Sequence, residues 1–236
     1  MWFAPFASEG FSFLKLANIP DSLSHVVMAG VVTLIIFFLA RAVYSSYDKA
    51  ENPVVPDAKL SLRNIIELVV EQLLNLFQGL LGEQAPRYLP LLGTIFIYVF
   101  IANFMGLIPG LLPPTDNLNT NAPIALIVFL YYNYDGIREH GLGTYLKHFM
   151  GPVWWLAFLM IPIEIISHVF RPLSLSLRLF GNITGDHMVL AAFGNLTPVL
   201  VPVIFVGLGL FVCFMQAFVF AFLSAIYINL ATSHDH

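Results

Sequence analysis

Long apolar stretches alternate with short polar connections along the chain of 236 residues. Five of these stretches are expected to cross the ~30 Å hydrocarbon core of a bilayer as helices, although the third is purely apolar only from Ile124 to Leu130 and must include Tyr131 and Asn133 to span it. They cover residues 24–44, 88–112, 121–137, 153–193 and 199–231. The pattern predicts an all-α polytopic membrane protein with five spanning helices, in which residues 1–236 form a single membrane domain and residues 1–23 lie outside the membrane.

Residues 60–81 follow a different pattern, because polar side chains recur there every three or four positions between apolar ones. These polar residues are Asn64, Glu67, Glu71, Asn75 and Gln78. The spacing predicts a helix with a narrow polar stripe. Such a helix either lies at the membrane interface or packs sideways on other helices, and the interface is favoured.

The last two apolar stretches are longer than a single perpendicular crossing needs. At ~1.5 Å per residue, residues 199–231 would be roughly 50 Å long as one helix, which exceeds the ~30 Å core. Both helices are therefore expected to be strongly tilted or bent, and to form a hairpin.

Basic residues gather in two of the connections and set the expected orientation. Arg41, Lys49, Lys59, Arg63 and Arg87 lie between the first two spans, and Arg138 and Lys147 lie between the third and fourth. Basic connections face the cytoplasm. This places the N-terminus and the loop of Asp116 outside and the C-terminus in the cytoplasm.

Composition narrows the function classes. The chain is 58% hydrophobic and 10% charged, with a mean hydropathy of +0.83, which fits a chain surrounded by lipid. A net charge of -4 with scattered basic residues argues against a nucleic-acid partner. The single cysteine, Cys213, excludes an internal disulfide and a multi-thiolate metal site. We expect neither a cofactor nor a metal, and the N-terminus does not resemble a cleaved signal peptide.

One face of the stretch 153–193 carries polar residues that are unusual inside a membrane. Glu164, His168, Arg171, Ser174, Arg178 and Asn182 fall three or four positions apart and so share a helix face. Ionisable groups at membrane depth cost at least ~2.5 to 3.5 kcal/mol each, and they usually serve ions or protons. The stripe predicts a hydrated path, and the alternative is a buried network that joins helices.

Arg178 is the most informative residue of this stripe, because a guanidinium stays charged and cannot relay protons. Glu164 lies about 21 Å away along the helix, and Asp186 lies about 12 Å away and is turned aside. We therefore expect the compensating carboxylate to come from another chain, with water and Gln216 supplying part of the solvation.

Two histidines and one row of small residues leave alternatives open. His187 is a candidate proton carrier or an interfacial histidine. His168 is either part of the path or a hydrogen-bond partner of Glu164 one turn away. Small residues at every fourth position allow another helix to approach closely, either from this chain or from a neighbouring subunit. They are Gly209, Cys213, Ala217, Ala221 and Ala225.

The run PLSLSLRLFGN at residues 172–182, followed by QAFVF at residues 216–220, resembles subunit a of the membrane sector of bacterial F-type ATP synthases. The NLNT segment at residues 117–120 and Glu164 fit the same family. The resemblance implies a non-catalytic stator subunit in the cell inner membrane that provides two half-channels. Its partners would be a ring of c subunits with mid-membrane carboxylates, the peripheral-stalk subunit b and the rest of the synthase.

The same resemblance implies roles for individual residues. Arg178 would separate the half-channels, with Gln216 close to it. Asn182 and His187 would line the outer half-channel, and Glu164 and Ser174 the cytoplasmic one. The position of His187 is a carboxylate in some relatives, and Gly209 stands where those relatives have a histidine, so the titrating group has changed helices. The ring site, and not this chain, selects H⁺ or Na⁺.

Two other classes remain as alternatives. A stand-alone proton-coupled secondary transporter would also place Arg and His in its spans, but internal repeats are typical of that class and none is visible here. A membrane-embedded hydrolase or metalloprotein would need His168 and His187 as ligands, but they are not arranged in a His-Glu-x-x-His motif.

Overall fold

The computed structural model describes residues 20–48, 61–108, 110–143, 145, 157–194 and 200–232. Most of them lie in six long helices joined by turns. The helices are α2 (Asp21–Asp48), α3 (Leu62–Leu81), α4 (Ala85–Met105), α5 (Leu118–His140), α7 (Ala157–Gly194) and α8 (Leu200–Thr232). Two short 3₁₀ turns, η1 (Gly82–Gln84) and η2 (Pro114–Asp116), lie before α4 and α5.

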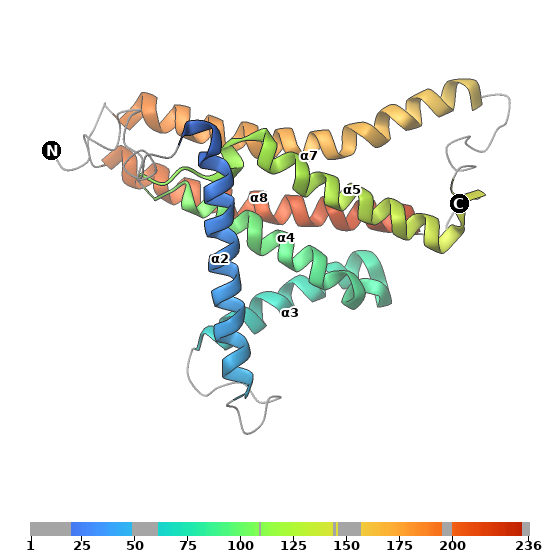
Figure 1. The fold of residues 1–236 in the computed structure, drawn as a ribbon, viewed down its shortest axis with the longest axis horizontal. Coiled ribbons are helices and arrows are strands. Elements are labelled where there is room, and N and C mark those ends of the chain that lie inside the picture. Colours follow the sequence, from blue (N-terminus) through green and yellow to red (C-terminus); the bar gives the residue numbers. More distant parts are fainter. Residues whose placement is uncertain are drawn as a thin grey trace.

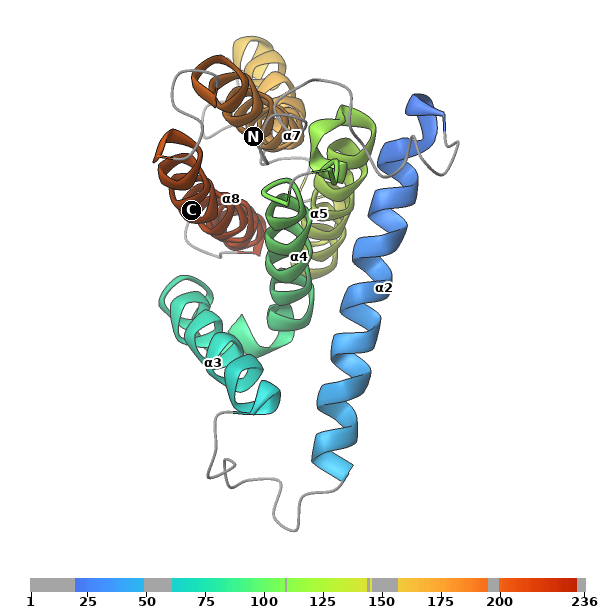
Figure 2. The ribbon, with the colours of Figure 1, turned by 90° about the vertical axis from the view of Figure 1, so that its left-hand side faces the viewer.

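The helices form an elongated group crossed by one separate helix. Figure 1 shows α4, α5, α7 and α8 running in similar directions, with α2 crossing them steeply near one end. Figure 2 shows the same four helices end-on, with α2 standing to one side. Met28 and Val32 of α2 are buried in a small cluster with Ala102 and Met105 of α4. Most of the remaining surface of α2 is exposed.

Four helical stretches in the described part of the chain are long and apolar enough to cross a membrane. They are Ser22–Tyr47, Leu62–Met105, Phe158–Asp186 and Ile204–Thr232. The protein is therefore a helical, polytopic membrane protein. The residues of the third expected span do form a helix, α5, although α5 is not one of these four. Five crossings and an interfacial α3 remain predictions.

Helix α3, the polar-striped helix expected at residues 60–81, covers Leu62–Leu81. The residues next to its two ends explain where it begins and ends. The Ser61 side chain accepts a hydrogen bond from the Asn64 backbone N–H at 3.3 Å, which caps the first turn of α3. Gly82 ends the helix with a φ of 56°, a value that favours glycine. Leu73 and Phe77 are buried and Glu71 is exposed, but Ile65 and Leu68 are exposed as well, so burial along α3 follows the polar stripe only in part.

The second expected span, residues 88–112, differs from the helix that forms there. Helix α4 covers Ala85–Met105 and stops although the apolar sequence continues. The backbone N–H of Gly106 bonds the Asn103 carbonyl oxygen, and Gly110 has a φ of 90°. An added Cβ at Gly106 would lie 2.9 Å from Pro113 Cγ, so the chain folds back closely after α4.

The core lies where α4 packs along α8. The small residues of α8 are buried inside the chain: Ala217, Ala221 and Ala225 belong to this core cluster, and Cys213 is buried as well. A Cβ on Gly209 would lie only 2.5 Å from Leu107 Cδ2. The described part of the chain thus answers the question left open by the spacing, because these residues accept a helix of the same chain. Residues from α3 and α5 complete the cluster.

Candidate functional site

Helix α7 carries the predicted polar stripe and is attached to the rest of the molecule along a narrow strip. Leu175, Ser176, Leu179 and Ile183 are its buried residues among the described side chains. None of the described side chains from Phe158 to Ser174 is buried. Figure 1 shows α7 as a long, bent helix that lies over α5 and α8.

Arg178 lies on the outer face of α7 and is exposed. Its neighbours Leu173 and Leu177 are large, exposed and apolar, at 44% and 46% exposure. Within the ranges that the structure describes, Arg178 forms no hydrogen bond and no ion pair. A fixed positive charge therefore stands on an apolar surface without an acidic partner from this part of the chain.

Gln216 lies on α8, the helix that packs beside α7. Its side chain is half-buried and follows the exposed Met215 and precedes the buried Ala217. No hydrogen bond joins Gln216 to Arg178 or to any other residue in the described ranges. The expected pairing across the hairpin remains a prediction.

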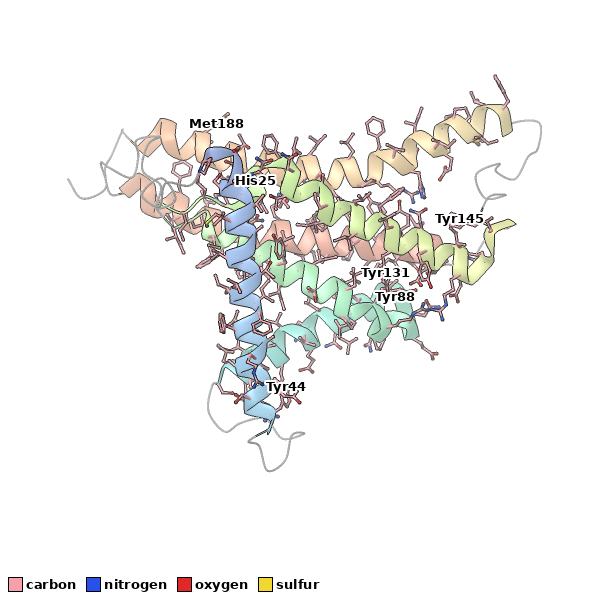
Figure 3. All side chains as sticks on the ribbon, in the orientation of Figure 1. His25, Tyr44, Tyr88, Tyr131, Tyr145 and Met188 are labelled. Atoms are coloured by element: carbon pink, nitrogen blue, oxygen red, sulfur yellow. The ribbon has the colours of Figure 1, made fainter. Side chains whose placement is uncertain are left out.

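A polar cluster gathers where α2, η2 and α7 meet. Thr184 Oγ1 donates to Asp116 Oδ1 at 3.1 Å, and Asn117 Nδ2 lies 3.4 Å from His25 Nδ1. Figure 3 shows His25 at the same end of the molecule as Met188 on α7. The Asn182 side chain, two residues before Thr184 in the sequence, is half-buried. The sequence placed Asp116 in a loop outside the membrane, but it gave no signal for the contact of Asp116 with Thr184.

Two further titratable residues, Asp186 and His187, follow Asn182 and Thr184 along α7. Asp186 is half-buried and lies close enough to Cys213 on α8 for the two groups to interact electrostatically. The expectation that Asp186 is turned aside from Arg178 remains a prediction. His187 belongs to α7, but its side chain lies outside the described residues.

The other half of the stripe forms contacts that the sequence only partly indicated. Glu164 Oε1 lies 3.8 Å from Arg171 Nη2, and the Arg171 guanidinium lies 5.5 Å from the centre of the Tyr227 ring on α8. His168 Nε2 lies 2.8 Å from Asn133 Oδ1 on α5. This contact joins His168 to another helix, and the hydrogen bond between His168 and Glu164 stays a prediction. Ser174 is exposed.

A second arginine has a very different environment at the junction of α4 and α5. Arg87 Nη2 lies 2.8 Å from Asp135 Oδ1, and the side chains are 42% and 3% exposed. The rings of Tyr88 and Tyr131 meet edge to face there, 6.1 Å apart, and Figure 3 shows the two side by side. The nearly buried carboxylate is thus compensated by a cation of the same chain.

Among the described residues, no three His, Cys, Asp or Glu side chains gather closely enough to hold a metal ion. The polar side chains of the described part of α7 supply fixed charges, amides and hydroxyls along the helix. Such groups can attract, exclude or pass ions, and they fit a path for charge along an exposed helix face.

Comparison with known proteins gives a consistent result. The family model described as "ATP synthase A chain" matches residues 25–229. "ATP synthase subunit a" of Bdellovibrio bacteriovorus is 45% identical over 213 residues, which cover 90% of this chain and 93% of that protein. "ATP synthase subunit a 1" of Syntrophotalea carbinolica is 42% identical over 235 residues, covering 100% and 96%. "ATP synthase subunit a" of Geobacter sulfurreducens is 49% identical over 175 residues, covering 74% and 76%.

Proposed function

The chain belongs to the ATP synthase A chain family, and we propose that it is the ion-translocating stator subunit of a rotary F-type ATP synthase. In this role it performs no catalysis itself and works as a multi-pass protein of the bacterial inner membrane. It offers two half-channels that load protons onto, and remove them from, the mid-membrane carboxylates of a c-ring. The flow of protons then drives rotation and ATP synthesis.

The observation that carries this proposal is the state of Arg178. Its guanidinium is exposed among apolar side chains and has no acidic partner in the described ranges. A charge at membrane depth is stable only when a partner or water compensates it. A carboxylate passing on a ring beside α7 supplies this partner repeatedly and without forming a permanent pair.

The fixed charge of Arg178 also gives proton transfer a direction. Because arginine stays protonated, Arg178 cannot hand a proton from one half-channel to the other. It attracts an ionised ring carboxylate, so each carboxylate releases its proton to one side before it passes. Gln216 on the neighbouring helix supplies an uncharged polar group at this position.

The two half-channels begin on either side of Arg178 along the same helix. Ser174 and Asn182 each stand four residues away, about 6 Å in opposite directions. Asn182 and His187 belong to the outer half-channel, beside the cluster of Asp116 and Thr184. Ser174 and Glu164 belong to the cytoplasmic one.

The finer architecture belongs to the same proposal. Five helices cross the membrane with the N-terminus outside and the C-terminus in the cytoplasm, and α3 lies at the interface. Helices α7 and α8 form a tilted hairpin against the ring, and α2 stands apart from them (Figure 2). Subunit b of the peripheral stalk and the rest of the synthase hold the chain against rotation.

Cysteine accessibility tests the two half-channels in the assembled complex. In a Cys213→Ala background, we expect Ser174→Cys to react with a membrane-impermeant maleimide from the cytoplasmic side and Asn182→Cys from the outer side. Leu179→Cys is the matched control, since Leu179 is 1% exposed and should stay unreactive. Protection of both test positions from both sides would remove the aqueous-path proposal, and full activity of the purified chain alone would favour a transporter.

A further inference from the structure

We propose that His168 is a positioning residue, whose imidazole fastens α7 to α5 through a shared amide oxygen of Asn133, and that it does not carry protons. What it positions is the helix of Arg178, so the inference rests on the proposed function. The three groups of this anchor, His168, Asn133 and Tyr145, lie on different segments of the chain.

The hydrogen bonds fix which atoms donate. Asn133 Nδ2 donates to the Phe129 carbonyl oxygen at 2.6 Å, so the amide oxygen must point the other way. That oxygen accepts from Tyr145 Oη at 2.8 Å and lies 2.8 Å from His168 Nε2. An amide oxygen can only accept, and it has two lone pairs. His168 therefore carries hydrogen on Nε2, and in its neutral form Nδ1 is the acceptor.

The groups around the imidazole come from every helix that packs there. The rings of Phe129 and Tyr132 on α5 each lie 5.4 Å from the His168 ring and meet it edge to face. On its own helix the nearest charges are Glu164 and Arg171, which pair with each other at 3.8 Å. From α8, Tyr227 contributes the ring beneath Arg171. The imidazole thus stands between aromatic rings and an ion pair that is already balanced.

Helix α7 needs an anchor at this point because its packing is sparse. No described side chain from Phe158 to Ser174 is buried. Pro172 lies inside the helix and has no N–H, so the carbonyl of His168 loses its usual helical partner. A proline at this place allows a bend, and Arg178 follows His168 by about 15 Å. The hydrogen bond to Asn133 fixes how the first half of α7 is turned before the bend.

Tyr145 is itself held in place, which makes the anchor rigid. An added Cβ on Gly136 would lie 2.7 Å from Tyr145 Cε2 and 3.0 Å from the Ala231 carbonyl oxygen. The ring therefore packs against bare backbone of α5, beside the end of α8. Burial raises the pKa of the Tyr145 hydroxyl, so it stays protonated and able to donate. Figure 3 shows Tyr145 beside α5.

The decisive experiment compares His168→Gln with His168→Leu in assembled complexes reconstituted into vesicles. Glutamine can donate a hydrogen bond to Asn133 but cannot titrate, whereas leucine can do neither. We expect His168→Gln to keep the wild-type pH profile of proton-driven ATP synthesis with less than a twofold loss. We expect His168→Leu to lose about tenfold or more, because misplaced groups reduce rates steeply. Equal loss in both variants, with a shifted pH profile for glutamine, would overturn the proposal.

A second readout does not depend on proton transport. Ser176 on α7 is 3% exposed, and a Ser176→Cys probe in a Cys213→Ala background reports whether α7 has turned. The probe should stay unreactive towards maleimide with His168 or His168→Gln, and become reactive with His168→Leu. Unchanged protection in His168→Leu would contradict the anchor. If the wild-type complex showed no proton transport, but His168→Leu still made the Ser176→Cys probe more reactive, only the proposed function would be contradicted.

A matched tyrosine pair completes the test. Tyr145→Phe removes one donor to Asn133, whereas Tyr134→Phe changes a tyrosine of α5 that is 63% exposed. We expect a smaller but measurable rise in labelling of the Ser176→Cys probe for Tyr145→Phe and none for Tyr134→Phe. Equal labelling in the two variants would remove Tyr145 from the anchor.

Discussion

Arg87 and Arg178 show two ways in which this chain treats a positive charge on an apolar helix. Arg87 lies at the start of α4, 2.8 Å from a carboxylate of α5 that is almost fully buried. Arg178 lies on α7 close to the exposed Leu173 and Leu177 and has no acidic partner among the described residues. The first charge is compensated within the chain, and the second is left for something outside it.

The difference separates a structural pair from a functional one. A pair formed inside the chain joins two helices permanently, and neither partner is available to a passing group. A lone cation can bind and release a carboxylate many times, provided that its helix is held in the correct orientation. The surroundings therefore indicate function better than the residue type does, since both residues are arginines in apolar helices.

The largest expected effect is that of Arg178→Ala. We expect it to abolish proton-driven ATP synthesis while ATP hydrolysis by the detached soluble sector stays intact. Each proton crossing 100 mV carries about 2.3 kcal/mol, which becomes rotation only if the direct route between the half-channels is closed. Lysine should not rescue fully, because it lacks the planar fork of donors and can lose its proton.

The measurement is ATP formation beside passive proton flux in reconstituted vesicles under an imposed gradient. Near-normal ATP synthesis by assembled Arg178→Ala complexes would contradict the proposed role of Arg178 and the contrast between the two arginines.

Removing Arg87 should damage stability and leave coupling intact. Arg87→Leu leaves the Asp135 carboxylate, which is 3% exposed, without its cation, and should destabilise the chain by about 1–3 kcal/mol. Asp135→Asn should cost less, because the freed Arg87 side chain is 42% exposed and reaches water. The dissociation temperature of the complex and the ratio of synthesis to proton flux check both points. A larger loss from Asp135→Asn would show that the pair is not asymmetric.

His187→Ala is expected to have a several-fold effect that depends on pH. An imidazole titrates near neutral pH, so its loss should slow proton entry more at high outside pH, where free protons are scarce, than at low pH. Proton uptake by vesicles at several outside pH values measures this. A loss that is the same at every pH would assign His187 a structural role, like that of the Arg87 pair.

Thr184→Val is expected to have the smallest effect. It removes the hydrogen bond from Thr184 Oγ1 to Asp116 and should lower stability by about 0.5–1.5 kcal/mol. Thr94→Val is the matched control, because the Thr94 hydroxyl bonds only the Pro90 carbonyl of its own helix. Equal changes in the dissociation temperature of the two variants would mean that the contact between η2 and α7 adds nothing.

Local signals in the sequence predicted some elements closely. The polar stripe predicted a helix over residues 60–81, and α3 covers Leu62–Leu81. The end of α4 was harder to predict, because hydropathy is the same in a helix and in the apolar turn that follows Met105. Hydrophobicity reports the surrounding solvent and does not report backbone conformation.

Contacts between distant segments could not be predicted. Periodicity placed His168 on the polar face of its helix, but its partner Asn133 lies 35 residues away. The pairing of Glu164 with Arg171, seven residues further along the same helix, was likewise not part of the expectation. The spacing of Cys213, Ala217 and Ala221 likewise indicated close packing without saying which helix packs there.

The length of α7 has a mechanical consequence. Its 38 residues make a helix about 57 Å long. A helix with its side chains is only about 10–12 Å wide, so under the proposed function several ring hairpins would lie along α7 at once while a single one faces Arg178. Under the proposed function, the sideways load of rotation is thus spread over several contacts, and the stator helix is not left to bear the whole torque at one charged residue.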